Sequence, residues 1–572
     1  MNRCKSVRRL LITLLLLLSL VTVPALASGG DTVEISTAEG LMELLSTSYG
    51  DCYKKTYGKT FVLTKDITID TSELKTSFNA NSAPSRAFDG IFDGGGHTVT
   101  VVEAESGEPS MPLFDWVGTN INNDQASIRN LNLVFEGNVS GAPLAAVIGN
   151  GAVENVNIEF QKDILFAEAK SDFNYAAATG VFVFLGASSG AEKNPTSIKN
   201  VSVSATGPAP YGVIGSAQPQ DMQYVMAAGV YSERNLAGAA CVLEVVEVSV
   251  RAVCALSNYA LGNSTVCAAG AVSGHYQSNL RLGYTTVTVA ESILSEAVSG
   301  SGVSEVYSFG LAYDAYAFRE CSVSVGGSVQ AIAAEGVSAS AYAAGLGLSV
   351  SNKYNQQEPQ GGAYHNWGEG TGKCSVTVGG DILASVSSAV SDKVVAAACG
   401  AAYNTGHQYV WNDVTIDVAG SISARGGGLC KAYASGFAHQ PYNEPNVLDQ
   451  NVDYENCSVT AGSISAVSPE YGGYAAGFMR WCYGACKNCS VTAGSIDSSG
   501  IDADVSGFAP GSRPTPRPTS ATRTASSTAA RSPRAASAPS TRTPTTPQMP
   551  PASSSRSRTL SPASAQRYAA AK

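Results

Sequence analysis

Charge, histidine and long apolar runs are all scarce in this 572-residue sequence. Charged residues make up 14% of the chain, and it contains 5 histidines and 4 tryptophans. The longest apolar run, Leu10–Val23, is shorter than the roughly 20 residues that cross a bilayer as a helix. We therefore expect no transmembrane segment in the mature chain, and the sequence predicts no cofactor and no metal.

The short apolar run belongs to an expected signal peptide, residues 1–27. Four basic residues precede the run, and Ala25-Leu26-Ala27 follows it with the small residues of a cleavage site after Ala27. The whole chain has a formal net charge of −10, but the leader and residues 509–572 carry four and ten positive charges and no acidic residue, so residues 28–508 carry −24. An acidic body disfavours nucleic acid and anionic lipid as partners. The expected location is secreted or cell surface.

What the sequence has in abundance is repetition. The nonapeptide Asn-Cys-Ser-Val-Thr-Ala-Gly-Ser-Ile occurs at 456–464 and again, unchanged, at 488–496. Looser copies of its apolar/polar alternation give ten repeat anchors in all. They lie at positions 131, 156, 201, 248, 287, 321, 374, 414, 457 and 489.

Each copy alternates apolar and small polar residues, which is typical of a strand buried on one face. An Ala-Ala-Gly step or a close relative follows each strand, and the segment between that glycine and the next anchor varies in length. Identical layers that stack while one turn varies are the pattern of a solenoid. The sequence therefore predicts an all-β solenoid of parallel strands over residues 59–508, with one coil per unit. Two short coils per unit remain the alternative for the longer copies.

The N-terminal segment, residues 28–58, contains the one good helix candidate. Ser36 and Glu39 have the spacing of a capping box, and Leu41-Met42 and Leu44-Leu45 follow them. We expect this helix to cover the N-terminal end of the stack.

Twelve of the 13 cysteines remain once Cys4 leaves with the leader, and an even count suggests disulfides in an exported chain. The repeat register favours another interpretation for Cys321, Cys374, Cys457 and Cys489, because Leu or Val fills the same place in other copies. These four are predicted to be buried thiols that act as small hydrophobes. The sequence leaves open the disulfide state of Cys241, Cys254, Cys267, Cys399, Cys430, Cys482 and Cys486. Cys482, Cys486 and Cys489 have the spacing of half a zinc site, but a second Cys/His pair is missing.

A family resemblance rests on an ordered set of segments near the N-terminus. They are Thr60-Phe-Val-Leu-Thr-Lys-Asp-Ile, then Phe88-Asp-Gly-Ile-Phe-Asp-Gly-Gly-Gly-His, then Pro112-Leu-Phe-Asp-Trp and Ile128-Arg-Asn-Leu. In this order the chain resembles exported bacterial right-handed parallel β-helix proteins with GLUG-like repeats and adhesin-like surface roles. The resemblance covers roughly residues 31–508 and implies fold and export. A Leu-Pro-x-Thr-Gly sorting signal is absent, so the mode of anchoring stays open.

A β-helix can also carry a polysaccharide lyase or a glycosidase, which needs clustered carboxylates. The best local candidates are Asp89 and Asp93, which we interpret as Asx turns because each stands beside a glycine. No catalytic residue is predicted, and a non-catalytic rod for adhesion or for binding a glycan or a surface-protein ligand is the preferred function. A carbohydrate-active enzyme on the same fold is the alternative.

The segments of variable length are rich in aromatic residues, whose rings suit sugars or a protein partner. The alternative is that these rings fold back and seal their own loops. The candidate binding residues are His275, Tyr276, Tyr316, Tyr354, His365, Trp367, Tyr403, His407, Tyr409, Trp411, His439, Tyr442, Trp481 and Tyr483.

After Phe508 the repeat stops. Residues 509–572 hold 11 of the 24 prolines and otherwise mostly Ser, Thr, Ala and Arg, a composition that predicts a disordered tail. The tail is interpreted either as a wall-spanning linker or as the product of a frameshift inside the next repeat, and the sequence leaves both open.

Overall fold

The structure is a computed structural model that describes most of residues 31–506. The gaps in this range are residues 72–85, 104–108, 120–125, 150, 163, 166–174, 186–195, 206–210, 214–223, 232–240, 253–255, 262–264, 275–277, 300–304, 316, 335–338, 351–370, 406–409, 440–452 and 481–484. The predicted leader and tail lie outside the described residues. Within them the chain is mostly strands, and every strand pair is parallel.

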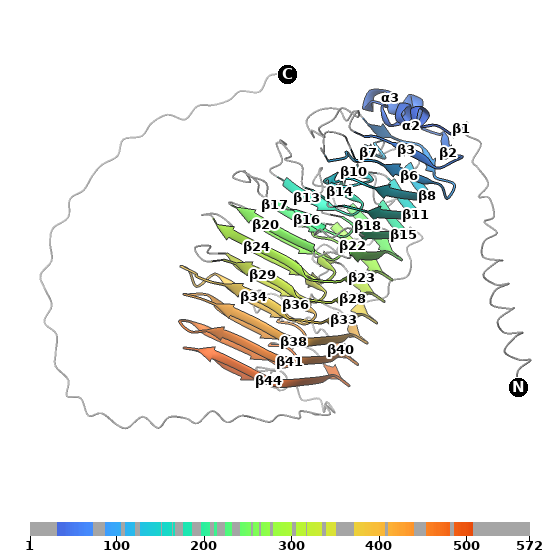
Figure 1. Cartoon of the computed structure of the whole chain (residues 1–572). Coiled ribbons are helices and arrows are strands. Elements are labelled where there is room, and N and C mark those ends of the chain that lie inside the picture. Colours follow the sequence, from blue (N-terminus) through green and yellow to red (C-terminus); the bar gives the residue numbers. More distant parts are fainter. Residues whose placement is uncertain are drawn as a thin grey trace, which may run out of the picture. The chain divides into compact units, whose positions relative to one another are not determined.

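Two helices lie at the N-terminal end of the stacked strands, after strand β1 (Thr32–Ile35) (Figure 1). Helix α2 (Ala38–Leu45) buries Leu41, Leu44 and Leu45 in the same core that the first strands build. Its N-cap is Thr37, whose Oγ1 accepts a hydrogen bond from the Gly40 amide at 3.1 Å, so the cap lies one residue after the predicted Ser36. Helix α3 (Tyr49–Lys55) was not predicted.

The largest sheet has 27 strands that run side by side along the stack (Figure 1). Its strands besides β1 are β2 (Thr60–Leu63), β3 (Ile67–Ile69), β5 (Ile91–Asp93), β6 (Thr98–Val101), β8 (Ala126–Phe135), β11 (Gly151–Phe160), β15 (Thr196–Ala205), β16 (Tyr211–Val213), β18 (Cys241–Val246), β19 (Ser249–Ala252), β20 (Leu256–Leu261), β22 (Ser278–Gly283), β23 (Thr286–Val289), β24 (Ile293–Ser299), β27 (Ala317–Arg319), β28 (Ser322–Val325), β29 (Val329–Ala333), β32 (Thr371–Gly372), β33 (Ser375–Val378), β34 (Ile382–Val386), β37 (Val410–Asn412), β38 (Thr415–Gly426), β40 (Asp453–Glu455), β41 (Ser458–Ser468), β43 (Cys486–Lys487) and β44 (Ser490–Gly500).

A nine-stranded sheet forms a second side of the stack. It consists of β13 (Tyr175–Thr179), β17 (Tyr224–Ala228), β21 (Thr265–Ala269), β25 (Glu305–Phe309), β30 (Ser340–Ala344), β35 (Val395–Cys399), β39 (Lys431–Ser435), β42 (Gly472–Ala476) and β45 (Asp504–Ser506). Three smaller sheets complete the described strands. They are β4 (Ala87–Phe88), β7 (Phe114–Val117), β10 (Ala145–Ile148) and β14 (Phe182–Leu185); β26 (Ala312–Ala315), β31 (Gly347–Val350) and β36 (Ala402–Asn404); and β9 (Val139–Ser140) with β12 (Ile164–Leu165).

The strand register follows the repeat anchors. Leu131 pairs with Val156 and Val156 with Val201, and the residues after the later anchors pair in the same way down to Ser458 with Ser490. The strands of each unit pair with those of the next unit, so each repeat unit forms one layer of the stack. The predicted anchors are therefore confirmed, with one exception.

The exception is the anchor predicted at Val287. Ser249 pairs with Thr286, and Thr286 pairs with Ser322, so the residue equivalent to Val248 and Cys321 is Thr285. The error arose because a shift of two residues leaves every side chain on the same face. Thr285 is fully buried in a place that other units fill with Leu, Val or Cys, and its hydroxyl donates a hydrogen bond to the Gly283 carbonyl at 3.1 Å.

The recurring glycine after each strand of the nine-stranded sheet has a steric cause. A Cβ on Gly400 or Gly436 would overlap the carbonyl oxygen of the corresponding glycine in the next layer, Gly436 or Gly477. The same is true at Gly229, Gly270, Gly310 and Gly345. This close backbone approach recurs in the layers from Gly229 to Gly436 and keeps the Ala-Ala-Gly step constant there.

Candidate functional site

The most regular local feature is a left-handed residue immediately before each anchor. Ten residues other than glycine have a positive φ, between 50° and 57°. Six are Asn or Asp, the residue types that tolerate this conformation best. They are Asn130, Asn155, Asn200, Glu247, Tyr284, Glu320, Lys373, Asp413, Asn456 and Asn488. Each turns the chain between two strand stretches of the largest sheet, and we call this place the corner.

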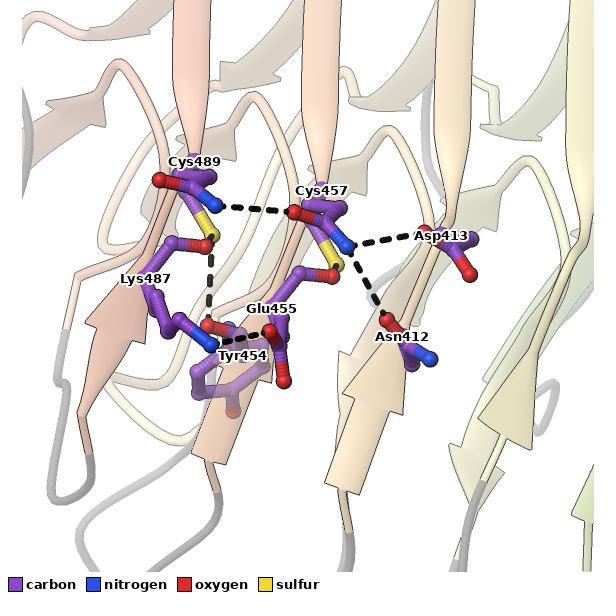
Figure 2. Close-up of polar contacts among 9 residues, drawn as sticks. Asn412, Asp413, Tyr454, Glu455, Cys457, Lys487 and Cys489 are labelled. Carbon is purple, nitrogen blue, oxygen red and sulfur yellow. Dashed lines mark hydrogen bonds and ion pairs between the residues drawn. The ribbon is translucent and has the colours of Figure 1, made fainter.

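Polar side chains bridge the corners of successive layers (Figure 2). The side-chain amide of Asn488 donates to Asn456 Oδ1 at 3.1 Å, and that of Asn456 donates to Asp413 Oδ1 at 3.0 Å. Beside them Lys487 Nζ lies 2.5 Å from a carboxylate oxygen of Glu455. The same ladder occurs near the N-terminal end, where Asn200, Asn155 and Asn130 are joined by amide hydrogen bonds. The alignment of Asn130 with Asn488 in the sequence carried this signal, but it did not reveal the bend.

Inside the corner lie the cysteines of the repeat. Cys321, Cys374 and Cys457 are at most 1% exposed and Cys489 is 8% exposed, and all four are free thiols. Figure 2 shows the Cys489 sulfur directed toward the carbonyl oxygen of Tyr454, to which it donates a hydrogen bond at 3.4 Å. The prediction of buried thiols is thus confirmed. Cys267, Cys399 and Cys430 are buried and Cys486 is half-buried, all as thiols, while the side chains of Cys241, Cys254 and Cys482 lie outside the described residues.

The outer face of the strand stretch after each corner carries two rows of residues that are mostly Ser and Thr, which we call the hydroxyl face. The first row is Ser202, Ser249, Thr286, Ser322, Ser375, Thr415, Ser458 and Ser490, in register from layer to layer. The second row is Ser204, Arg251, Thr288, Ser324, Thr377, Asp417, Thr460 and Thr492. From Arg251 onward every member of the second row is exposed.

Neighbouring hydroxyls of this face are hydrogen-bonded along the stack. Ser322 Oγ lies 3.2 Å from Thr286 Oγ1, and Ser458 Oγ lies 3.4 Å from Thr415 Oγ1. Because neighbouring strands are about 4.8 Å apart, the face presents donors and acceptors at a constant spacing. Such a fixed polar array can bind a ligand whose own hydroxyls repeat.

The inner strands of the nine-stranded sheet are buried on both faces, and the outer face bears an aromatic column. Tyr307 and Tyr342 stack with centroids 5.1 Å apart, and Tyr433 and Tyr474 stack at 5.2 Å. Where Ala397 interrupts the column, the adjacent Tyr403 and His439 fill the gap, stacked at 5.0 Å. The Arg480 guanidinium caps the column, 4.0 Å from the Tyr474 ring centroid.

This packing corrects the predicted binding face at two residues. Trp411 is fully buried against Phe437, and its Nε1 donates to the Thr405 carbonyl at 3.3 Å. His439 is 2% exposed between Tyr403 and Tyr433. Neither ring is open to a ligand, because each completes the packing of its own layer, and half-buried Tyr403 belongs to the same column. The other eleven candidates lie outside the described residues: His275, Tyr276, Tyr316, Tyr354, His365, Trp367, His407, Tyr409, Tyr442, Trp481 and Tyr483.

Burial sets the protonation of this column. Desolvation, with the nearby Arg480 charge, holds the pKa of His439 well below its usual range, and His439 Nδ1 has no hydrogen-bond partner among the described residues. Desolvation likewise raises the pKa of Tyr342 to about 12. His439 and Tyr342 are therefore neutral at physiological pH.

The two candidate carboxylates have different roles. Asp93 forms the predicted Asx turn, since its Oδ1 accepts from the Gly95 amide at 3.0 Å, and it also accepts from Arg129 Nε at 2.9 Å. Asp89 does not follow the prediction. It is 5% exposed and accepts from the amide and the hydroxyl of Thr119, both at 2.5 Å, and from the Cys52 thiol at 3.2 Å. Asp89 thus ties helix α3 to the first layers.

A buried ion pair lies in the same N-terminal layers. Arg86 and Asp115 are at most 2% exposed, and Arg86 Nε and a terminal guanidinium nitrogen both donate to Asp115 Oδ1, at 3.2 and 2.5 Å. In the described part of the chain, no three His, Cys, Asp or Glu side chains gather in an arrangement that could hold a metal ion. No described helix is long and apolar enough to cross a membrane.

Comparison of the chain with known proteins gave no match to a family model and none to a curated protein.

Proposed function

We propose that the chain is an extracellular or cell-surface rod without catalytic activity, which binds a neutral polysaccharide through the hydroxyl face. The proposal includes closure of the parallel sheets into a right-handed β-helix. The observation that carries it is the double row of mostly Ser and Thr side chains, one row half-buried to exposed and the other exposed, in register over successive layers.

The physical support is a match of spacing and charge. A polymer of sugars offers hydroxyls at regular intervals, and many weak hydrogen bonds along a rigid array add up to avidity. The net charge of −24 on residues 28–508 repels anionic polymers and leaves neutral ones as the favoured class. The predicted aromatic loops outside the described residues remain a second proposed contact region.

The alternative, a carbohydrate-active enzyme, needs carboxylates free to act as acid and base. The candidate carboxylates in the N-terminal layers are held in structural contacts instead. Asp93 and Asp115 pair with Arg129 and Arg86, and Asp89 is bonded to Thr119. These contacts favour the binding function.

The test introduces arginine at places where a neighbouring layer already has an arginine or where arginine occupies the same row. Arg251 occupies the second row next to Thr288, and Arg425 is the counterpart of Ser385 in the next layer, outside the hydroxyl face. Binding of the full chain to a panel of insoluble neutral and acidic polysaccharides identifies the ligand. The double variant Thr288→Arg/Thr377→Arg should then bind at least about tenfold more weakly, a loss of about 1.4 kcal/mol.

Ser385→Arg is the matched control and should bind as the native chain does. Equal affinity of the double variant and the control would refute the role of the hydroxyl face. Failure of the native chain to bind any polymer of the panel would refute the function itself.

A further inference from the structure

The last described corner differs from the earlier ones in the two residues that line its inner side. At each corner two side chains point into the core. One belongs to the residue two places before the left-handed residue, and the other belongs to the residue directly after it. In register along the stack these two places hold Phe318 and Cys321, Thr371 and Cys374, Trp411 and Val414, Tyr454 and Cys457, and finally Cys486 and Cys489. Among these described corners, only the last has a cysteine at both places.

The bend at Asn488, with a φ of 53°, brings these two side chains together. The thiols of Cys486 and Cys489 are in hydrogen-bond contact across it, and Cys489 is also in contact with the Cys457 thiol of the preceding layer. Cys486 is in register with Trp411 and Tyr454, whose large rings extend into the core. The shorter Cys486 side chain ends close to the bend.

Access to this pair comes from its position in the stack. Within the described residues, strands β43 and β44 pair on one side only, with β40 and β41. Cys486 is accordingly half-buried, whereas Cys457, one layer further in, is fully buried. A small reagent can therefore reach Cys486 first.

The electrostatics of the three sulfurs favour a thiolate at one of them. Hydrogen bonds from the Cys457 and Cys486 thiols lower the pKa of Cys489. The same contact, together with burial, raises the pKa of Cys457. Cys489 therefore ionises before Cys457, and a thiolate is the form that attacks a disulfide.

We propose that Cys486 and Cys489 are a redox-active dithiol that a small-molecule disulfide, such as oxidised glutathione, converts to an intrachain disulfide. The Cys489 thiolate takes the proton of the hydrogen-bonded Cys486 thiol, and Cys486 then attacks one sulfur of the small disulfide while the first small thiol leaves as a thiolate. Cys489 then attacks the Cys486 sulfur of the mixed disulfide, and the second small thiol leaves. The two cysteines lose two protons and two electrons, and the two released thiols gain them.

The sequence between the cysteines allows a direct test by peptide mapping. The reduced full chain is incubated with oxidised glutathione, its remaining thiols are alkylated, and trypsin is added. Cleavage after Arg480 and Lys487 separates Cys486, in peptide 481–487, from Cys489, in the peptide that begins at Asn488. The expected result is that these two peptides are joined by a bond that reduction breaks.

Three variants make the outcome decisive. Cys486→Ser and Cys489→Ser should each abolish the cross-link, and Cys482→Ser should retain it. Cys321 and Cys374, both 1% exposed, are the internal control. Their thiols should stay unmodified in the folded chain and be alkylated once it is unfolded. Recovery of Cys486 and Cys489 as two alkylated thiols would overturn the proposal. A cross-link from Cys489 to the peptide that holds Cys457, or a cross-link lost in Cys482→Ser, would overturn it as well.

Discussion

The two copies of the nonapeptide are the same sequence in two environments. In the first copy Val459 is 1% exposed and Ile464 is fully buried. In the second copy Val491 and Ile496 are only partly buried, although they pair with Val459 and Ile464 in register. The difference is that β41 has a described neighbour on each side, β38 and β44, whereas β44 has one on a single side. Burial in this fold thus belongs to the stacking of layers and not to the nonapeptide itself.

The aromatic column of the nine-stranded sheet shows the same contrast between a covered layer and the last described layer. His439 and Arg480 occupy equivalent places in successive layers, one residue after the bridged pair Ala438 and Met479. The inner layer holds a buried neutral imidazole and the outer one a half-buried guanidinium. A layer that is covered by the next one excludes charge, and a layer at the edge accepts it.

The largest expected effect comes from removing the same side chain in the two copies. Ile464→Ala leaves a cavity between two layers and should destabilise the chain by about 2–5 kcal/mol. Ile496→Ala removes less buried area and should cost about 1 kcal/mol or less. Urea unfolding followed by circular dichroism measures both, and each variant is the control of the other. Equal losses would mean that the second copy is also covered, and would break the comparison.

A smaller effect is expected from acid. Because the pKa of His439 in the folded chain lies well below the unfolded value of about 6.5, the unfolded chain binds a proton that the folded chain does not. Stability is therefore fully present above pH 6.5 and falls as the pH drops below it, by up to about 1.4 kcal/mol per pH unit. His439→Phe keeps the ring stacked and removes the proton, so it should lose this part of the slope between pH 6.5 and 5. The measurement is urea unfolding of the native chain and the variant at several pH values.

A control variant at Arg480 tests whether the acid slope comes from His439 itself. Arg480→Gln removes a charge that helps to lower the pKa of His439, but desolvation, the larger cause, remains, so most of the acid slope should persist in it. A slope that is unchanged in His439→Phe would show that the imidazole is protonated in the folded chain, against its burial.

The repeat register and the burial of the cysteines could be predicted from sequence because stacking demands like residues at like places. Val459, Cys457 and their counterparts report the inner face by alternation alone. The register failed at Thr285, where a hydroxyl bonded to its own turn replaced an apolar side chain. Alternation has a period of two, so it cannot detect a slip of two.

The candidate site was less predictable for a different reason. Trp411 and His439 follow the same glycine landmarks as the variable segments, but the sequence does not say which of these rings turn inward. Their burial depends on contacts with Phe437 and Tyr433 in other strands, which no local pattern encodes. The bend at the corner was also missed, since Asn before an anchor is a weak signal when Glu, Tyr and Lys adopt the same φ elsewhere.

The smallest expected effect tests whether the Asn ladder joins the layers or only permits the bend. Glycine adopts a positive φ freely, so Asn→Gly keeps the corner and removes the amide. Asn456 has partners on both sides, Asn488 on one and Asp413 and Asn412 on the other, whereas Asn488 is bonded to Asn456. Asn456→Gly should therefore cost about 0.5–1 kcal/mol more than Asn488→Gly. Native-state hydrogen exchange of the amides in β41 and β44 resolves a difference of this size. If the two variants exchange alike, the amides add nothing between layers, and the asparagines are present for their backbone conformation alone.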